Sequence, residues 1–251
     1  MNIIINKKKI SNSFNRAVQY YDKYAKLQKI VGNILMSKID FQKNMFILDA
    51  GSGTGWFSKK LKQKSNKVIA LDLSQQMLMY ARSKNTANYY LEGDIENLPF
   101  KNNIFDLTWS NLSLQWCENF SRSVQELCRV TQPGGTVIFS TLIKGSLSEL
   151  SKAWKKIDNY IHVNQFITVQ KILHSCCNKI LVLEIKTIKF SFTTILEALL
   201  SVKRIGATYV NIKKNKSVLN KSIMKQLQYS WPSKKNKFLL SYKLAIGIIY
   251  I

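Results

Sequence analysis

The sequence has few of the residues and runs that mark membrane, secreted or modular proteins. No apolar run approaches the ~20 residues that cross a bilayer, and Met1–Ile5 is too short for a signal-peptide core, so we expect neither feature. The three prolines are scattered, and neither a Pro-, Gly- or Ser-rich linker nor an internal repeat is present. With 251 residues, 46% of them hydrophobic, the chain is expected to form one globular domain with at most a small addition.

Cysteine is scarce, and its spacing is uninformative about metals. Cys117, Cys128, Cys176 and Cys177 form no C-x-x-C pair. A disulfide framework or a zinc site needs regular pairs, so we expect free thiols, no bound metal and a reducing, cytoplasmic setting.

Arginine and acidic residues are scarce beside lysine. Of 38 basic residues 33 are Lys and 5 are Arg, against 14 acids, which gives a formal charge of +24. Phosphate and base recognition depend on the planar fork of Arg, and the chain shows no stripe of interleaved basic and aromatic residues. Two explanations stay open: compositional drift toward Lys, Asn and Ile, and an acidic partner that uses the charge.

Short apolar runs alternate with helical stretches between residues 45 and 139, a pattern typical of β-α units on a parallel sheet. The expected strands here are 45–50, 68–73, 105–110 and 136–140, and the expected helices are 56–64, 120–130 and one capped by Ser74. Elsewhere we expect helices in 8–38, 147–157, 169–175, 194–203 and 220–229, and strands in 179–192 and 237–251. Residues 1–40 are expected to form a helical cover on a main domain of 41–251, with a helical lid insertion at about 193–232.

The most informative stretch is a glycine-rich turn that follows the first expected strand. Asp49 ends that strand, and Gly51, Gly53 and Gly55 alternate after it, which lets the backbone turn tightly against a ligand at a helix N-terminus. The nicotinamide fingerprint needs a small residue at the sixth position, where this chain has Trp56. The turn therefore argues against a nicotinamide site, although a merely structural turn would look similar.

Three more polar residues follow later strands in the same way. Asp72 lies 21 residues after Gly51, where an acid can accept from two ribose hydroxyls. Asp94 follows the next short strand, where it can accept from a purine amine while Ile95 supplies an apolar face. Asn111 ends the strand after that. Any one acid could be a solvated loop residue, but together these groups indicate a ligand at the carboxyl edge of the sheet.

This set of motifs resembles the class I S-adenosylmethionine-dependent methyltransferases. The resemblance implies an α/β, Rossmann-like, seven-stranded sheet whose last strand is antiparallel, with a helical cover. It implies S-adenosyl-L-methionine as cofactor, with the glycines and Asp49 at the methionine part, Asp72 at the ribose, and Asp94 with Ile95 at the adenine. The cofactor-binding residues that it implies are Asp49, Gly51, Gly53, Gly55, Asp72, Leu73, Met77, Asp94, Ile95 and Asn111.

Further segments resemble one branch of that family, the malonyl-acyl-carrier-protein O-methyltransferases that begin pimeloyl synthesis for biotin. They are Phe14–Gln28, Trp109–Cys117, Phe139–Leu147, Lys203–Thr208 and Trp231-Pro232. This resemblance implies methyl transfer to the free carboxylate of a malonyl thioester, with acyl carrier protein or coenzyme A as the thioester partner. It implies no nucleic-acid or membrane partner.

A carboxylate acceptor agrees with the scarcity of histidine. Acceptors such as amines or phenols usually need a base, whereas a carboxyl with a pKa near ~4 is already an anion at neutral pH. His162 and His174 lie in no motif, and we expect neither to act as a general base. Positioning and exclusion of water would then carry the catalysis.

The residues expected to bind the substrate are less certain from sequence. Lys203, with Arg204 beside it, is a candidate for orienting the carboxylate, although it could equally be one more solvated lysine. Tyr21 is a candidate for covering the cofactor or for contacting the acyl chain, and Trp116 for a wall of the pocket. Both aromatic residues could instead serve only in packing.

Three rival functions stay open at this level. The motifs between Gly51 and Asp94 do not exclude another class I methyltransferase with a small acceptor such as a quinone. The charge leaves an RNA-binding or RNA-modifying protein as a second rival. A non-catalytic relative is the third, but the complete set of acids and glycines argues against loss of the cofactor site.

Overall fold

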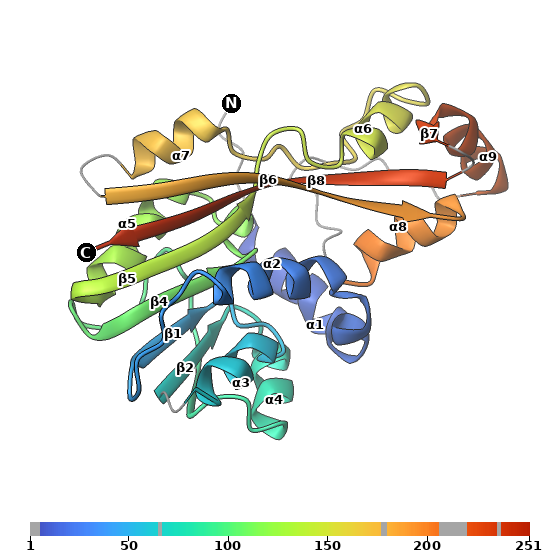
Figure 1. Ribbon diagram of the computed structural model, residues 1–251. Coiled ribbons are helices and arrows are strands. Elements are labelled where there is room, and N and C mark those ends of the chain that lie inside the picture. The colour runs from blue at the N-terminus through green and yellow to red at the C-terminus, as the bar shows by residue number, and fades with distance from the viewer. Residues whose placement is uncertain (1–5, 65–66, 177–179, 206–219, 235–236) are drawn as a thin grey trace.

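A computed structural model describes residues 6–64, 67–176, 180–205, 220–234 and 237–251 (Figure 1). Its centre is a mixed sheet in which neighbouring strands are not consecutive in the chain. From edge to edge the order is β3 (Tyr89–Glu92), β2 (Lys67–Asp72), β1 (Phe46–Ala50), β4 (Phe105–Asn111), β5 (Thr131–Leu142), β8 (Lys237–Tyr250) and β6 (Ile180–Phe192). β8 is antiparallel to both of its neighbours, whereas the pairs from β3 to β5 are parallel.

The expected seven-stranded sheet with an antiparallel last strand is thus confirmed. A two-residue strand, β7 (Ser233–Lys234), additionally pairs with the beginning of β8. Because β1, β2 and β4 are parallel neighbours, their carboxyl ends meet at one edge of the sheet. The loops that follow these strands are the ones that carry the polar residues singled out from the sequence.

The helices lie on both faces of the sheet and around one end of it (Figure 1). They are α1 (Lys7–Tyr24), α2 (Lys26–Met36), α3 (Trp56–Lys62), α4 (Gln75–Ser83), α5 (Phe120–Val130), α6 (Ser148–Lys155), α7 (Val169–Ser175), α8 (Ile195–Lys203), α9 (Lys221–Ser230) and a 3₁₀ turn, η1 (Leu114–Trp116). Ser74 caps α4 as expected, with its hydroxyl accepting from the Met77 N–H. In Figure 1, α6, α8 and α9 gather at one end of the β6–β8 pair.

Most expected elements agree with the structure to within two residues at each end, but two of them differ more. The first helical segment is two helices, because the chain leaves the helical region at Ala25 (ψ 41°). β5 begins at Thr131 and not at Thr136, because Thr131 pairs with Phe105 while Thr136 pairs with Leu107. Residues 132–135 bulge out between these two pairs, and they include Pro133, which cannot donate to a strand ladder.

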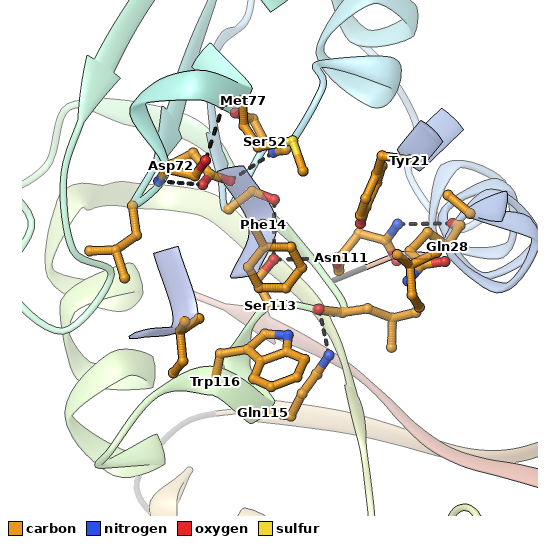
Figure 2. A pocket seen from close by; sticks show the side chains of 18 of the residues that line it. Phe14, Tyr21, Gln28, Ser52, Asp72, Met77, Asn111, Ser113, Gln115 and Trp116 are labelled. Carbon is orange, nitrogen blue, oxygen red and sulfur yellow. Dashed lines mark hydrogen bonds between the residues drawn. The ribbon is translucent and has the colours of Figure 1, made fainter. Parts of the chain in front are cut away.

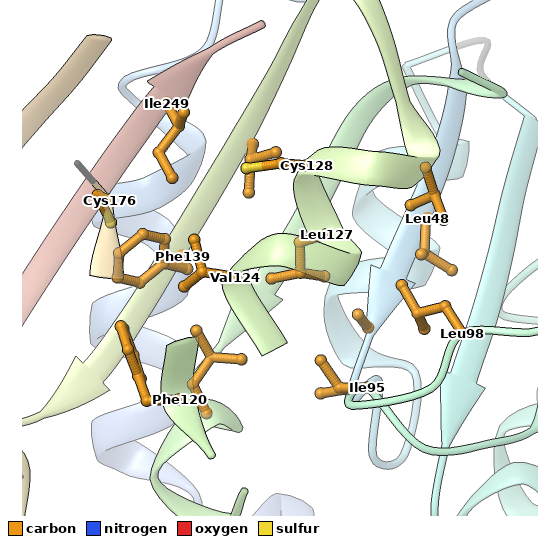
Figure 3. Close-up of a cluster of buried hydrophobic side chains, with 14 of the residues drawn as sticks. Leu48, Ile95, Leu98, Phe120, Val124, Leu127, Cys128, Phe139, Cys176 and Ile249 are labelled. Atoms are coloured by element: carbon orange, nitrogen blue, oxygen red, sulfur yellow. The ribbon is translucent and has the colours of Figure 1, made fainter. Parts of the chain in front are cut away.

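Alternation along the central strands divides the core between the two faces of the sheet. Leu48 belongs to the cluster that packs against α5 (Figure 3), whereas its neighbour Ile47 belongs to the cluster on the opposite face. A third cluster lies under α6, α8 and α9 and contains Leu240, Tyr242 and Leu244 from the first half of β8. Both halves of β8 are therefore buried, each in a different part of the core.

Candidate functional site

The glycine turn after β1 is held by positive backbone dihedrals. Gly51 has φ +81° and Gly53 has φ +55°, and both line a cavity at the carboxyl edge of the sheet. A Cβ on Gly51 would lie 2.2 Å from the Ser113 hydroxyl oxygen, so only glycine fits there. Gly55 (φ +77°) is not among the lining residues. It is the N-cap of α3, and a Cβ on it would collide with the side chain of Thr86. The expectation that Gly55 lines the ligand with the other two glycines stays a prediction.

Asp49 lies behind this turn. Its carboxylate is 2% exposed and accepts a hydrogen bond from the Ser58 hydroxyl of α3 at 2.5 Å. Burial raises the pKa of the Asp49 carboxyl to about 7; hydrogen bonds from Ser58 oppose the shift, and the charge of Asp72 adds to it. Asp49 borders the cavity and also ties the turn to the helix that follows it.

Asp72 joins two loops at the end of β2. One carboxylate oxygen accepts from the Gly53 N–H at 2.8 Å, and the other accepts from the Ser74 N–H at 2.8 Å (Figure 2). Burial raises the pKa of the Asp72 carboxyl, although these backbone hydrogen bonds oppose the shift. Leu73 and Met77 line the cavity on either side of Ser74. A buried carboxylate is thereby held at the place where β1 and β2 end.

Asp94 and Ile95 lie beyond the end of β3 and also line the cavity. One oxygen of Asp94 accepts from the backbone N–H of Glu96, and the other contacts the ammonium of Lys7. Lys7 also pairs with Glu96 at 2.6 Å. Burial lowers the pKa of Lys7, but the bonds to the two acids outweigh it and leave the pKa raised. The first residue of α1 is thus bound to the loop that follows β3.

Asn111 borders the cavity at the end of β4, but its side chain already has two partners. Its amide donates to the Gln28 carbonyl at 3.0 Å, and its amide oxygen accepts from the Ser140 hydroxyl at 2.9 Å. Asn111 therefore connects α2 with β4 and β5, which fixes the position of α2 over the edge of the sheet.

Aromatic side chains from α1 and η1 form one wall of the cavity. Phe14 lies between Tyr21 and Trp116, with edge-to-face contacts of 6.4 and 5.4 Å between ring centroids (Figure 2). Burial raises the pKa of the Tyr21 hydroxyl, and the charges of Asp72 and Asp22 add to the shift, so Tyr21 stays neutral. The structure therefore brings both aromatic candidates, Tyr21 and Trp116, to the cavity.

Two buried polar atoms at the glycine turn have no hydrogen-bond partner among the described residues. They are the side-chain oxygens of Gln28 and Ser52, and both residues line the cavity (Figure 2). Buried polar atoms are rarely left unsatisfied, so these two favour a ligand with hydrogen-bonding groups beside the turn. Neither residue was a binding candidate from sequence, because Gln28 is on a separate helix and Ser52 stands at a variable position of the motif.

The cavity continues past Asn111 into an apolar lobe beneath α6 and α8. The lobe is lined by Leu112, Leu142, Leu147, Leu150, His162, Val163, Asn164, Phe166, Val202, Ile205 and Tyr242. His162 lies in no sequence motif, and the loop after α6 brings it to this lobe. His174 is exposed on α7 and is not among the lining residues.

Lys203 and Arg204 do not line the cavity, although their neighbours Val202 and Ile205 do. Both basic residues are exposed, and the Arg204 guanidinium lies 4.4 Å from the ring centroid of Tyr24. The expectation that Lys203 contacts a bound carboxylate is therefore not met by its position. The rest of the segment that resembled the family, 206–208, lies outside the described residues.

Within the described ranges, no group of three or more His, Cys, Asp or Glu is placed to hold a metal ion. Cys117 is a free thiol there, Cys128 and Cys176 are buried, and Cys177 lies outside those ranges. Among the helices that the structure describes, none has both the length and the apolar character needed to span a bilayer.

The sequence of this chain is similar to those of known methyltransferases. Residues 48–139 match the family described as a methyltransferase domain. The malonyl-[acyl-carrier protein] O-methyltransferase of Buchnera aphidicola subsp. Baizongia pistaciae is 50% identical over 99% of this chain and all of its own. The enzyme of that name from Erwinia billingiae is 42% identical over 98% of both chains.

Solved structures support the fold at much lower identity. A protein of Bacillus halodurans superposes with a TM-score of 0.63 at 18% identity, covering 86% of this chain and 96% of its own. A geranyl diphosphate methyltransferase in complex with S-adenosylmethionine (SAM) gives 0.54 at 15% identity, covering 89% and 85%. By its identity to full-length relatives, the chain belongs to the malonyl-acyl-carrier-protein O-methyltransferase family, and it has the class I methyltransferase fold.

Proposed function

We propose that this protein transfers a methyl group from S-adenosyl-L-methionine to the free carboxylate of a malonyl thioester. The observation that carries the proposal is one cavity that joins the glycine turn and its acids to an apolar lobe. It occurs in a chain half identical to an enzyme named for this reaction. The methyl ester would then enter pimeloyl synthesis for biotin.

The described residues fit the proposed cofactor. In this proposal Asp72 accepts hydrogen bonds from the ribose hydroxyls, and Asp94, Ile95 and Met77 contact the adenine. All four residues line the cavity. The unpartnered oxygens of Gln28 and Ser52 offer acceptors to the ammonium group of the methionine part. The cofactor supplies an electrophilic methyl group on a sulfonium centre.

The acceptor needs no general base. Its carboxyl group has an ordinary pKa near ~4 and is ionised at neutral pH. The protein must then hold the carboxylate in line with the methyl group and exclude water. Phe14, Tyr21 and Trp116 supply an apolar wall suited to excluding water at that place.

The N-terminal helices are proposed to cover the cofactor. α1 contacts the loops after β1, β2 and β3, through Asp22, Ser11 and Lys7 respectively. We further propose that residues 1–40 act as this cover, and that the segment at about 193–232 acts as a lid over the apolar lobe. Ile195–Lys203 and Lys221–Ser230 of this segment are described helices, and Val202 and Ile205 line the lobe.

The thioester is proposed to arrive on an acidic acyl carrier protein in the cytoplasm. The proposal is supported by Lys203 and Arg204, which are exposed and adjacent in sequence to the lining residues Val202 and Ile205. The formal charge of +24 would steer an acidic partner at long range. The free thiol of Cys117 agrees with a reducing compartment.

The test mixes the purified protein with S-adenosylmethionine and malonyl-acyl-carrier protein, and follows the acyl group by mass spectrometry. We expect the gain of one methylene unit on malonyl and none on acetyl or succinyl carriers. If S-adenosylmethionine binds and no malonyl thioester is methylated, the substrate assignment is wrong, and quinone acceptors are the next to test.

A further inference from the structure

His162 is a polar side chain in an otherwise largely apolar lobe, and the structure holds it on two sides. Its ring stacks on the buried Trp154 of α6, with 3.7 Å between centroids and planes within 8°. Its Nε2 lies 2.8 and 3.0 Å from the two carboxylate oxygens of Asp158. The side chain is 11% exposed. A ring fixed on one face and one edge has little freedom to turn.

The second ring nitrogen is available to a ligand. Within the described part of the chain, Nε2 is the only nitrogen of His162 that has a hydrogen-bond partner. His162 itself lines the cavity, so this second nitrogen belongs to a ring that borders the space a ligand would enter. Because Nε2 is bound to a carboxylate, it carries a hydrogen, and a protonated ring presents Nδ1–H as a second donor. Asp158 ensures that this ring would not be an isolated buried charge.

The other positive side chains of the cavity are already engaged. Among the described lining residues they are Lys7 and Lys29. Lys7 is bound to Asp94 and Glu96, at the far end from the lobe. Lys29 donates to the Asp22 carbonyl at 2.7 Å and lies 3.6 Å from the ring centroid of Trp56.

Among the described residues that line the apolar lobe, His162 is the only basic side chain. The other titratable lining residue of the lobe, Tyr242, has a pKa that burial raises to about 12, so it stays neutral. Lys203 and Arg204, the cations expected from sequence, are not among the lining residues. Among the described residues that line the lobe, His162 is the one side chain that an entering anionic group would meet as a cation.

We propose that His162, oriented by Asp158 and Trp154, binds the free carboxylate of the substrate through Nδ1–H. This inference rests on the proposed function and names the residue that recognises its acceptor group. One carboxylate oxygen would accept from His162, which leaves the other free to receive the methyl group. The methyl ester carries no charge, so His162 would bind product more weakly than substrate.

Binding of small thioesters without turnover tests this role. Malonyl-pantetheine and its methyl ester avoid any contribution from a carrier protein, and their dissociation constants can be measured by calorimetry with S-adenosylhomocysteine present. His162→Gln keeps a polar side chain but cannot become a cation. We expect this variant to bind malonyl-pantetheine on the order of tenfold more weakly, because a hydrogen bond to a charged group is lost. Its affinity for the methyl ester should stay within twofold.

Two further variants complete the design. His174→Gln makes the same change on the exposed face of α7, and both affinities should equal those of the unaltered protein. Asp158→Asn keeps the His162 ring but removes the carboxylate beside it, and it should lower malonyl affinity selectively. S-adenosylhomocysteine binding by each variant reports on folding, because it uses the other end of the cavity. If His162→Gln no longer binds S-adenosylhomocysteine, it has not folded correctly. The malonyl affinity of Asp158→Asn then tests the role of His162.

The possible results separate the two proposals. If the unaltered protein methylates malonyl thioesters and His162→Gln or Asp158→Asn leaves malonyl affinity unchanged, the role of His162 is wrong and the proposed function stands. An equal loss of affinity for malonyl-pantetheine and for its methyl ester also overturns the role of His162. Such a loss would mean that the substitution changed the shape of the lobe and did not remove a contact with the charged carboxylate. If the unaltered protein neither binds nor methylates malonyl thioesters, both proposals fall.

Discussion

The hydroxyl of Thr54 in the glycine turn donates to the Asp22 carboxylate of α1 across 2.6 Å. Thr54 is 3% exposed, so this bond is shielded from water. Thr54→Val keeps the shape of the side chain but leaves Asp22 without this donor. We expect the free energy of unfolding to fall by about 1 to 3 kcal/mol, as for bonds to charged groups. Affinity for S-adenosylhomocysteine should also fall, because α1 covers the turn.

Urea denaturation and calorimetry check this prediction. Ser83→Ala, which removes an exposed hydroxyl bonded only within α4, serves as the control and should change neither quantity appreciably. If Thr54→Val behaves like Ser83→Ala, the bond to Asp22 contributes nothing to seating α1.

Two glycines with almost equal dihedrals separate backbone strain from steric conflict. Gly51 has φ +81° and a hypothetical Cβ 2.2 Å from Ser113, whereas Gly134 has φ +78° and nothing within 4 Å. Gly134→Ala should cost only the strain of a positive φ, about 1 to 2 kcal/mol. Gly51→Ala should cost roughly 1 to 3 kcal/mol more, from overpacking, and should also weaken cofactor binding. Equal unfolding free energies for the two variants would contradict this account.

The raised pKa of Asp49 makes stability depend on pH. The pKa rises from 3.8 to about 7 on folding, so the folded state binds more protons than the unfolded state between these values. The free energy of unfolding contributed by this group must therefore fall as pH rises from about 4 to about 7. Asp49→Asn should flatten that slope in urea denaturation at several pH values. Asp40→Asn, at an exposed carboxylate, is the control. An unchanged slope in Asp49→Asn would show that another group carries the dependence.

Asp72→Asn tests the proposed ribose contact. The amide cannot accept with both of its terminal atoms, so it loses either the Gly53 or the Ser74 bond and the charge-assisted bonds to ribose hydroxyls. We expect the dissociation constant for S-adenosylhomocysteine to rise by roughly tenfold or more. Calorimetry measures it. Binding at the unaltered affinity would remove Asp72 from the cofactor site.

Charge reversal at Lys203 and Arg204 tests the proposed carrier contact. With both changed to Glu, kcat/KM for malonyl-acyl-carrier protein should fall at least several-fold, because an acidic partner is repelled. The value for malonyl-pantetheine should not change, since neither residue lines the cavity. Lys171→Glu is the control: it reverses one charge on α7, at the other end of the β6–β8 pair from α6 and α8 (Figure 1). A loss with malonyl-pantetheine as well would mean that these residues act on the acyl group itself.

The cofactor half of the site was predictable because its signals are local. A buried strand, an acid and alternating glycines fix where Asp49, Gly51 and Gly53 lie, and Asp72 follows from the next strand of a parallel sheet. The spacing of Gly55 also suits the ligand, but Gly55 is the N-cap of α3, so its contact with a ligand stays a prediction.

The substrate half was not predictable in this way. His162 reaches the cavity from a loop whose path depends on α6, and Tyr242 reaches it from β8, far along the chain. The role of Lys203 stays a prediction, because sequence does not say which face of the end of α8 is turned inward. No local pattern encodes a lobe whose lining comes from several distant segments.

The place of β8 in the sheet has a consequence for biosynthesis. β8 pairs with β5 at seven positions and with β6 at thirteen, so it is an interior strand that the ribosome makes after all the others described. Until it emerges, the long strands on both sides have open edges, and Leu240, Tyr242 and Leu244 are missing from the cluster under α6, α8 and α9. The nascent protein would complete its sheet only after β8 has emerged, and until then the open edges of β5 and β6 could pair with other chains.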